Sequence, residues 1–327
     1  MNKKKSPLLA KLGSQKFIVL LVVIGLMLIF SVAAPNFRKY TTIVDLVNKS
    51  YFVILMAIGV TFPLITGGVD LSIGTGLICY ALAGGYLIVN KGWPTWAGML
   101  VAVIFGCVVG LINGLLIAVM ELPPFLATLC TCMMTRGLGS ICAHNFGISW
   151  PSSGDGSWFR SIFKITVDKK VIPLGFIWIL LLVVIMAFVL NHTKVGRYTF
   201  AIGSNKEATR LSGVNVKLYH VIAYVLSGLF AGLAAIAYAA TFPTVQPGTG
   251  AGFELEAIGG AIIGGVSATG GYGSIEGSLI GVFVICLLKT GLPFIGLQAN
   301  WQQIITGFVL IGATLIDIIK NRASKNR

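Results

Sequence analysis

The residues that could carry out chemistry are few and scattered in this chain of 327 residues. Its three histidines have no partner at the spacing of a metal site or a catalytic triad, and its six cysteines form no CxxC pair. No G-x-x-x-x-G-K-[ST] phosphate loop occurs, and the glycine-rich run at 259–277 lacks G-x-G-x-x-G spacing. We therefore predict no enzymatic activity, no metal site and no cofactor bound by this chain.

The most informative polar residues interrupt a long apolar run. Two glycines followed by Val69 and Asp70 break the otherwise apolar segment 51–89. A carboxylate at membrane depth is costly unless it is paired, caps a helix or meets water. Asp70 or Ser72 therefore either caps the following helix or belongs to a translocation path. The residues assigned to a candidate path or gate are Gly67, Gly68, Asp70, Ser72, Thr128 and Arg136.

Other charged residues border or enter apolar segments. Glu254 and Glu256 begin a predicted helix, where they either favour its N-terminal dipole or contact an external protein. Arg136 and Lys289 are cations within apolar segments. Each of them pairs with a carboxylate, reaches the membrane interface or lines the path, and the sequence is compatible with all three roles.

A basic loop at residues 191–217 contains a predicted short helix. Ser204 or Asn205 can cap this helix, and Gly213 can end it. Such a helix, bounded by glycines, can insert into a groove on a soluble partner, and the alternative is an ordinary solvated connector. We call the loop 191–217 the predicted coupling loop. The residues assigned to this docking role are Gly196, Gly203, Asn205, Glu207, Ala208, Arg210 and Gly213.

The apolar face of that short helix is the part expected to meet the partner. We predict that Ala208 and Leu211, together with the neighbouring Ile202, form this face at the membrane surface.

The elements that must position these residues are apolar segments, because a bilayer core needs about 20 apolar residues in a helix. A mean hydropathy of +0.91 and a charged fraction of 10% exclude an ordinary soluble domain. We predict an all-α, polytopic membrane protein with one transmembrane domain at 17–319 and tails at 1–16 and 320–327. The ten predicted helices are 17–34, 43–66, 71–89, 95–119, 124–142, 171–190, 218–240, 254–267, 275–292 and 302–319.

The basic residues indicate the orientation of the chain. Fourteen of the 24 Lys and Arg residues lie in the two tails and the loop 191–217. The positive-inside rule then places both termini and this loop in the cytoplasm, which requires an even number of spans. Because the net charge of +14 is spread over short loops and tails, we expect membrane lipid as the surrounding partner and no nucleic acid.

Several segments resemble, in the same order, the ribose-type monosaccharide permeases, which are membrane subunits of bacterial ATP-binding-cassette importers. The resemblance extends from about residue 40 to 319 and includes the loop 191–217. Cys130-Thr131-Cys132, Asn145-Phe146-Gly147 and Gly259-Gly260 depart from the family pattern, which puts the identity of the sugar in doubt. The other matching segments are Thr66–Gly74, Pro124–Leu129, Phe253–Ile258, Ile263–Ser267 and Gly273–Gly281.

The resemblance implies a type II importer-like fold and a permease that moves ribose or a related monosaccharide across the bacterial inner membrane into the cytoplasm. ATP would be used by a separate cytoplasmic ATPase that docks on the loop 191–217. A periplasmic sugar-binding protein would deliver the sugar and contact Glu254 and Glu256. A second permease subunit, expected to form a homodimer, would complete the path, with a heterodimer of sister permeases as the alternative.

A different transport mechanism is also compatible with the residues. An ion-gradient-driven secondary transporter of a small polar solute would use the broken helices as its site and need no partner. The scarcity of carboxylates within the apolar segments argues against it.

Overall fold

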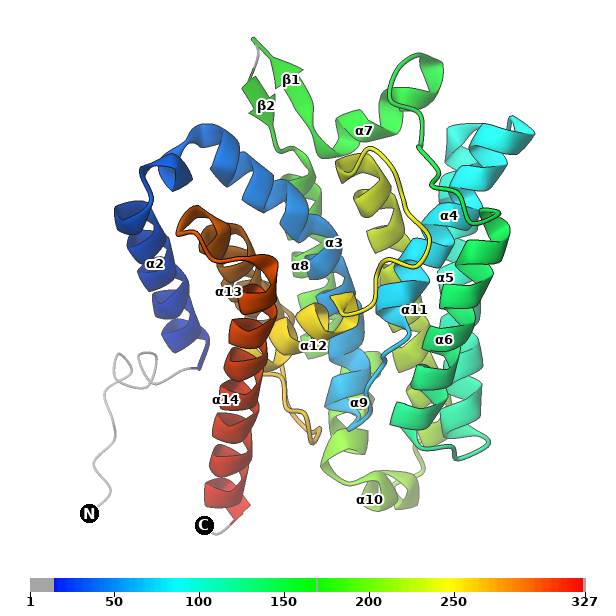
Figure 1. The fold of residues 1–327 in the computed structure, drawn as a ribbon. Helices are drawn as coiled ribbons and strands as arrows, with labels where there is room; N and C mark the ends of the chain where they lie inside the picture. Colours follow the sequence, from blue (N-terminus) through cyan, green and yellow to red (C-terminus); the bar gives the residue numbers. More distant parts are fainter. Residues whose placement is uncertain (1–14, 169, 326–327) are drawn as a thin grey trace.

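The structure is a computed structural model that describes residues 15–168 and 170–325. Long helices run between two ends of the molecule, with a short β-hairpin at one end and the helix α10 at the other (Figure 1). Eight described helices are long and apolar enough to cross a membrane. They are α2 (Gln15–Ala33), α3 (Tyr40–Ile65), α4 (Ile73–Lys91), α5 (Thr95–Ala118), α6 (Pro124–Cys142), α8 (Gly175–His192), α11 (Val216–Thr241) and α13 (Ile275–Phe294).

Shorter elements connect these helices. The hairpin joins β1 (Ile165–Val167) to β2 (Lys170–Ile172) in antiparallel register, with Thr166 opposite Val171. The remaining helices are η1 (Pro35–Arg38), η2 (Asp155–Ser157), α7 (Trp158–Phe163), α9 (Lys194–Ser204), α10 (Lys206–Leu211), α12 (Phe253–Ile263) and α14 (Ala299–Lys325).

The predicted all-α membrane fold is confirmed, apart from the small hairpin. Each predicted apolar segment corresponds to a helix, although α12 has only 11 residues. The count of ten spans stays a prediction, because α12 is too short to cross a bilayer and the side chains of α14 beyond residue 315 are not described. The predicted tail 1–16 lies largely outside the described residues, whereas residues 320–325 of the second predicted tail belong to helix α14.

Helix α3 forms the centre of the molecule. It is buried along nearly its whole length from Ser50 to Ile65, and α4, α8, α11, α12 and α13 pack around it. Helices α5 and α11 pack closely together beside it, where Gly106 and Gly228 face each other. A Cβ atom on either glycine would collide with the backbone of the opposite helix, so close helix packing depends on small residues here.

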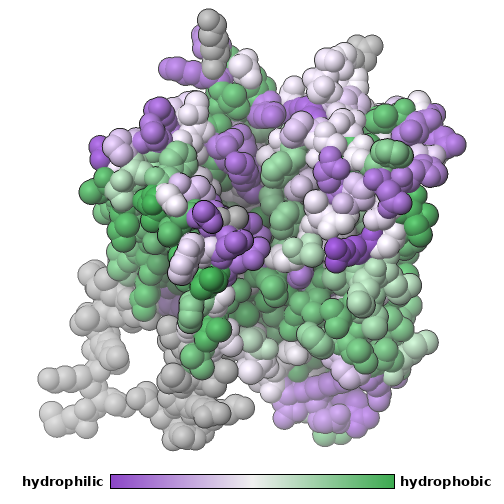
Figure 2. All heavy atoms as spheres, viewed as in Figure 1, coloured by the Kyte–Doolittle hydropathy of each residue, from purple (hydrophilic) through white to green (hydrophobic). Residues whose placement is uncertain are grey.

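The surface agrees with a membrane environment. Figure 2 shows a hydrophobic band between hydrophilic regions at the two ends of the molecule. Exposed apolar side chains include Leu28 on α2, Ile104 on α5 and Val184 on α8. Such residues are costly in water but not against lipid, so these helices form the outer, lipid-facing layer.

The first and the last described helix each have an end on the same side of the fold. The start of α2 and the end of α14 are at the same end of the molecule as α10, opposite the hairpin and α7 (Figure 1). This arrangement agrees with an even number of membrane crossings. That the shared end is cytoplasmic stays a prediction based on charge.

Candidate functional site

The first break, residues 66–72 between α3 and α4, holds a buried carboxylate. Gly67 permits the turn, because its φ of +83° is accessible mainly to glycine. Asp70 is fully buried. It accepts hydrogen bonds from the Ser72 backbone N–H at 3.0 Å, from Ser72 Oγ at 2.6 Å and from Ser227 Oγ of α11 at 2.6 Å. These donors compensate for the loss of water around the carboxylate.

The hydrogen-bond network of the first break extends to two more helices. Asn113 of α5 donates from Nδ2 to Ser72 Oγ at 2.9 Å, and Thr131 of α6 donates to Asn113 Oδ1 at 2.8 Å. Thr128 Oγ1 of α6 also lies 3.2 Å from the carbonyl oxygen of Val69. The first break is therefore tied by polar side chains to α5, α6 and α11.

The structure brings together most residues of the predicted path. Gly67, Gly68, Asp70, Ser72 and Thr128 all lie at or beside the first break, whereas Arg136 is exposed on α6 and takes no part in this network. The network residues that sequence reasoning missed are Asn113, Thr131 and Ser227.

Helix capping at the first break differs from the expectation. The side chain of Ser72 precedes α4 but makes no capping hydrogen bond to it. Asp70 binds the backbone N–H of Ser72 itself, one residue before the helix begins. The carboxylate therefore shapes the turn that leads into α4. Whether solute passes along this break stays a prediction.

The predicted coupling loop folds into two helices, α9 and α10. Asn205 caps α10, since its Oδ1 accepts a hydrogen bond from the Ala208 backbone N–H at 2.9 Å. Glu207 and Arg210 form an exposed ion pair at 2.9 Å. Gly213 follows the helix with a φ of +81°. The predicted short helix is thus confirmed, whereas α9 was not predicted.

The apolar face of α10 is smaller than expected. Leu211 is 82% exposed, and Ala208 is exposed beside it. Ile202 is only 3% exposed, because it belongs to α9 and turns into the protein. The prediction that Ile202 shares this face is wrong, because the chain changes direction at Asn205, between the two helices.

Glycines on α9 permit close backbone contacts. Gly196 packs against the backbone of Leu190 in α8, where a Cβ would collide. Gly203 packs against the carbonyl group of Ile65 at the end of α3, and a Cβ on it would also lie 2.6 Å from the amide nitrogen of Gly271. The Gly271 N–H donates to the Ile65 carbonyl at 2.9 Å.

These contacts join three segments that are far apart in sequence. Gly271 belongs to the second break, residues 264–274 between α12 and α13. The contact of Gly203, Ile65 and Gly271, which we name the coupling junction, therefore brings the predicted coupling loop against the second break and against the end of α3 that leads into the first break. The sequence indicated each of the three segments but not their meeting.

The two acidic residues of α12 have different surroundings. Glu254 Oε1 accepts the Gly252 backbone N–H at 2.9 Å, which folds the carboxylate back on the helix start. Glu256 pairs with Lys289 of α13 at 2.6 Å, and its side chain is 12% exposed. Of the roles considered for Lys289, pairing with a carboxylate is the one observed. Contact of either glutamate with a binding protein stays a prediction.

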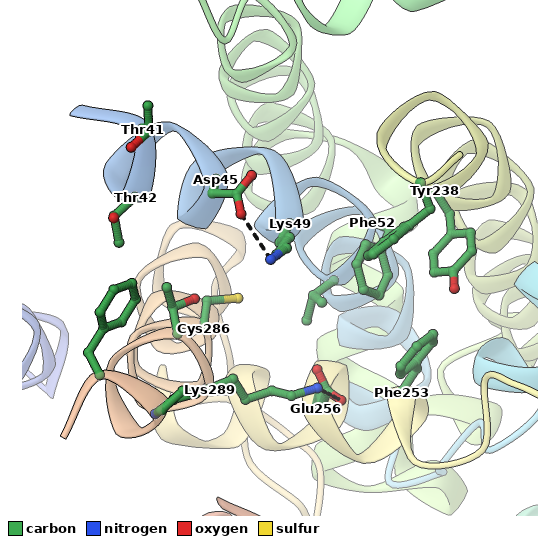
Figure 3. A pocket seen from close by; sticks show the side chains of 15 residues that line it. Thr41, Thr42, Asp45, Lys49, Phe52, Tyr238, Phe253, Glu256, Cys286 and Lys289 are labelled. Atoms are coloured by element: carbon green, nitrogen blue, oxygen red, sulfur yellow. Dashed lines mark hydrogen bonds and ion pairs between the residues drawn. The ribbon is translucent and has the colours of Figure 1, made fainter. Parts of the chain in front are cut away.

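Glu256 and Lys289 line a cavity that the sequence did not indicate. Its volume is about 740 Å³, and it lies among α3, α11, α12 and α13. Figure 3 shows the Asp45–Lys49 pair on one wall and the Glu256–Lys289 pair on the opposite one, with aromatic side chains at one side. Within the described residues, no group of histidines, cysteines and carboxylates could hold a metal ion.

Comparison with known proteins places these features in a family. The model of the family described as "Branched-chain amino acid transport system / permease component" matches residues 42–314. The chain belongs to this permease family. The matched range includes both breaks, the predicted coupling loop and every residue of the cavity lining except Thr41, so this permease is a multi-pass inner-membrane protein of a transport system.

Several curated permeases are similar over nearly the full length. The ribose import permease protein of Escherichia coli (strain K12) is 33% identical over 312 residues, 94% of each chain. The fructose import permease protein of Bifidobacterium longum is 33% identical over 319 residues, 95% of this permease and 93% of the relative. The galactose/methyl galactoside import permease protein of Escherichia coli (strain K12) is 33% identical over 338 residues, 99% of each. No solved structure matches this permease.

Proposed function

We propose that this permease is the membrane-spanning subunit of an ATP-binding-cassette importer that carries a monosaccharide from the periplasm to the cytoplasm. The observation that carries the proposal is the similarity, over nearly the whole chain, to import permeases for ribose, fructose and galactose. The same similarity gives no support to a secondary transporter driven by an ion gradient. The permease itself binds no ATP in this proposal, and a separate cytoplasmic ATPase hydrolyses it.

Helices α9 and α10 are the proposed docking element for that ATPase. Helix α10 lies at one end of the molecule, and its exposed Leu211 and Arg210 are available to a partner groove. Behind it, α9 contacts the end of α3 and the second break at the coupling junction. A displacement of α10 by the ATPase would reach the membrane-embedded breaks through one short rigid helix.

The remaining partners follow from the same proposal. A periplasmic sugar-binding protein delivers the sugar at the end that carries the hairpin and α7. A second, identical permease subunit completes the path, and membrane lipid surrounds the pair. Both termini, the residues 1–16 and the residues 320–327, lie on the cytoplasmic side.

The decisive experiment measures uptake into proteoliposomes that contain the permease and its ATPase, with the binding protein outside and ATP inside. We expect uptake of a radiolabelled monosaccharide that needs ATP and persists when ion gradients are collapsed. Uptake that follows an ion gradient and ignores ATP would overturn the proposal.

A charge swap tests the docking helix separately. Arg210→Glu places like charges beside Glu207 and removes the exposed cation, so we expect loss of ATPase binding and of uptake. The double variant Glu207→Arg/Arg210→Glu restores the ion pair within α10 but not the cation at position 210. Uptake that stays lost in the double variant supports docking through Arg210, whereas full recovery would show that the pair only stabilises the helix.

A further inference from the structure

The cavity among α3, α11, α12 and α13 combines neutral overall charge with an aromatic wall. Lys49 Nζ lies 3.0 Å from Asp45 Oδ2, and Lys289 Nζ lies 2.6 Å from Glu256 Oε1. Each ammonium group thus has a carboxylate partner already in place. The lining therefore offers strong hydrogen-bond donors and acceptors without an excess of either charge.

The aromatic wall is formed by residues from three helices. The ring of Phe52 lies 5.3 Å from that of Tyr238 and 5.2 Å from that of Phe253, measured between centroids. Lys289 Nζ also lies 5.7 Å from the centre of the Phe253 ring, which fixes the cation beside this wall. The apolar C–H face of a small ring can pack here while its polar edge meets the ion pairs (Figure 3).

The size of the cavity suits a small molecule. Its volume of about 740 Å³ lies within the range of roughly 300–1,000 Å³ that is usual for ligand pockets. Apolar walls with a few convergent polar groups are also typical of such pockets. The cavity is large enough to admit a hydrated monosaccharide.

We propose that this cavity is the site at which the permease holds its solute, and that the solute is a neutral polyhydroxylated molecule. Carboxylates of Asp45 and Glu256 accept hydrogen bonds from solute hydroxyls, and Lys49 and Lys289 donate to hydroxyl oxygens. Phe253 packs against the ring of the solute. This inference rests on the proposed function and extends it to a site within the membrane subunit.

Charge distinguishes this solute from a zwitterion such as an amino acid. The carboxylate of an amino acid would have to compete with Glu256 for Lys289, and its ammonium group would compete with Lys289 for Glu256. Separating Glu256 from Lys289 is costly, because the Glu256 side chain is only 12% exposed and would be left as a poorly hydrated charge. Hydroxyl groups can add to both members of a pair without separating them.

The cavity is also connected to the coupling junction. Phe52 lines the cavity, and Ile65 ends the same helix α3 about 20 Å further along. Helix α12 begins with Phe253 and Glu256 at the cavity, and the second break follows its other end. A movement at the coupling junction would therefore displace α3 and α12, which both contribute to the cavity lining.

Thiol labelling within the cavity tests the proposal on the assembled transporter. Thr290 lines the cavity, so Thr290→Cys introduces a reporter there, and Ser153→Cys places a matched reporter in an exposed loop outside it. A membrane-impermeant methanethiosulfonate is applied in the presence of ribose, fructose, galactose or leucine, and mass spectrometry assigns each modified cysteine.

We expect a transported sugar to protect Cys at position 290 but not at position 153. Sugar at about ten times its half-protecting concentration should slow labelling about tenfold. We expect Glu256→Gln to reduce the protection. The second variant, Phe253→Leu, keeps an apolar side chain on the helix and should also reduce the protection. The matched control Glu121→Gln should leave the protection unchanged.

Failure of this inference is distinguishable from failure of the proposed function. The unmodified transporter is assayed first for ATP-dependent sugar uptake, and absence of uptake for every monosaccharide tested would contradict the proposed function. Uptake of a sugar that gives no protection at position 290 would overturn the inference alone. Protection by leucine and not by sugars would overturn the assignment of a neutral solute.

Discussion

The two breaks in the helices are held in different ways. The first break, at 66–72, is fixed by polar side chains: Asp70 and Ser72 bond to α5 and α11 through Asn113 and Ser227. The second break, at 264–274, meets its neighbours through closely approaching backbone, as Gly271 does with Ile65. The contact of Gly271 is a backbone hydrogen bond to the Ile65 carbonyl, and Ser267 Oγ lies 3.0 Å from Thr269 Oγ1 within the second break.

This difference indicates that the two breaks have different roles in the permease. The first break anchors α4 to three helices that lie around it. The second break joins α12 to the coupling junction by contacts whose fit depends on the absence of side chains. The second break is the one that α9 contacts directly, at Gly271, so we expect a displacement of α10 to act on it first.

The largest expected effect is on stability and comes from the first break. Asp70→Ala would leave the donors of Ser72 and Ser227 unpaired in a dry interior, at about 1–3 kcal/mol for each donor. We expect poor yield and a sharply lower apparent Tm in detergent. Asp45→Ala, which removes an exposed ion pair, is the control and should cost less than about 1 kcal/mol. Equal stability of the two variants would show that the network is not an anchor.

The next effect is on function and comes from the coupling junction. Gly203→Ala places a Cβ against the Ile65 carbonyl and should force α9 away from the end of α3 and from the second break. We expect overpacking to lower the free energy of unfolding by about 1–3 kcal/mol. We also expect stimulation of the ATPase by sugar to be lost. Gly137→Ala on α6, where a Cβ meets open space, is the matched control. Normal stimulation in Gly203→Ala would contradict a role of the junction in coupling.

A smaller loss of stability than that of Asp70→Ala is expected from a single donor of the network. Ser227→Ala removes one hydrogen bond to Asp70 while Ser72 continues to donate. The loss should be about 1.5–3 kcal/mol, because the acceptor is a carboxylate. Ser140→Ala, on α6, removes an exposed hydroxyl that bonds to its own helix and should have almost no effect. The measurement is the difference in apparent Tm between these two variants.

The smallest effect concerns charge next to the second break. Glu276 begins α13 and pairs with Lys16 at 3.1 Å, but both side chains are more than 40% exposed. Glu276→Gln should change stability by less than about 1 kcal/mol, and added salt should remove the difference. A large, salt-resistant loss would show that the second break depends on a fixed ion pair as well as on glycine contacts.

The hydropathy of the sequence was sufficient to predict which segments are helices, but not which helices pack against one another. Every predicted apolar segment is a helix, and the break at Asp70 was recognised from two glycines and a carboxylate. Ser227, by contrast, is one small residue among many on an apolar helix, and nothing in its neighbourhood marks it as a donor to Asp70. Such pairings depend on which helices lie side by side, which one sequence does not specify.

The predicted coupling loop and the cavity also depend on contacts between distant segments, which the sequence does not specify. Asn205, Glu207 and Gly213 follow local rules of helix capping, so the short helix was predictable. Gly203 acts through the carbonyl of Ile65, far away in the chain. The cavity pair of Glu256 and Lys289 was foreseen only as one of several roles for Lys289, because partner choice requires the packing of α12 on α13.

The long separation between Asp70 and Ser227 has a consequence for biosynthesis. The two residues are 157 positions apart, so the ribosome needs roughly 8–30 s to reach Ser227 at about 5–20 residues per second. During that interval α3 and α4 have already been made, and the carboxylate lacks one of its donors. The nascent permease must keep this region near water or the translocon until α11 arrives, which makes insertion of α11 the step that commits the chain to its final packing.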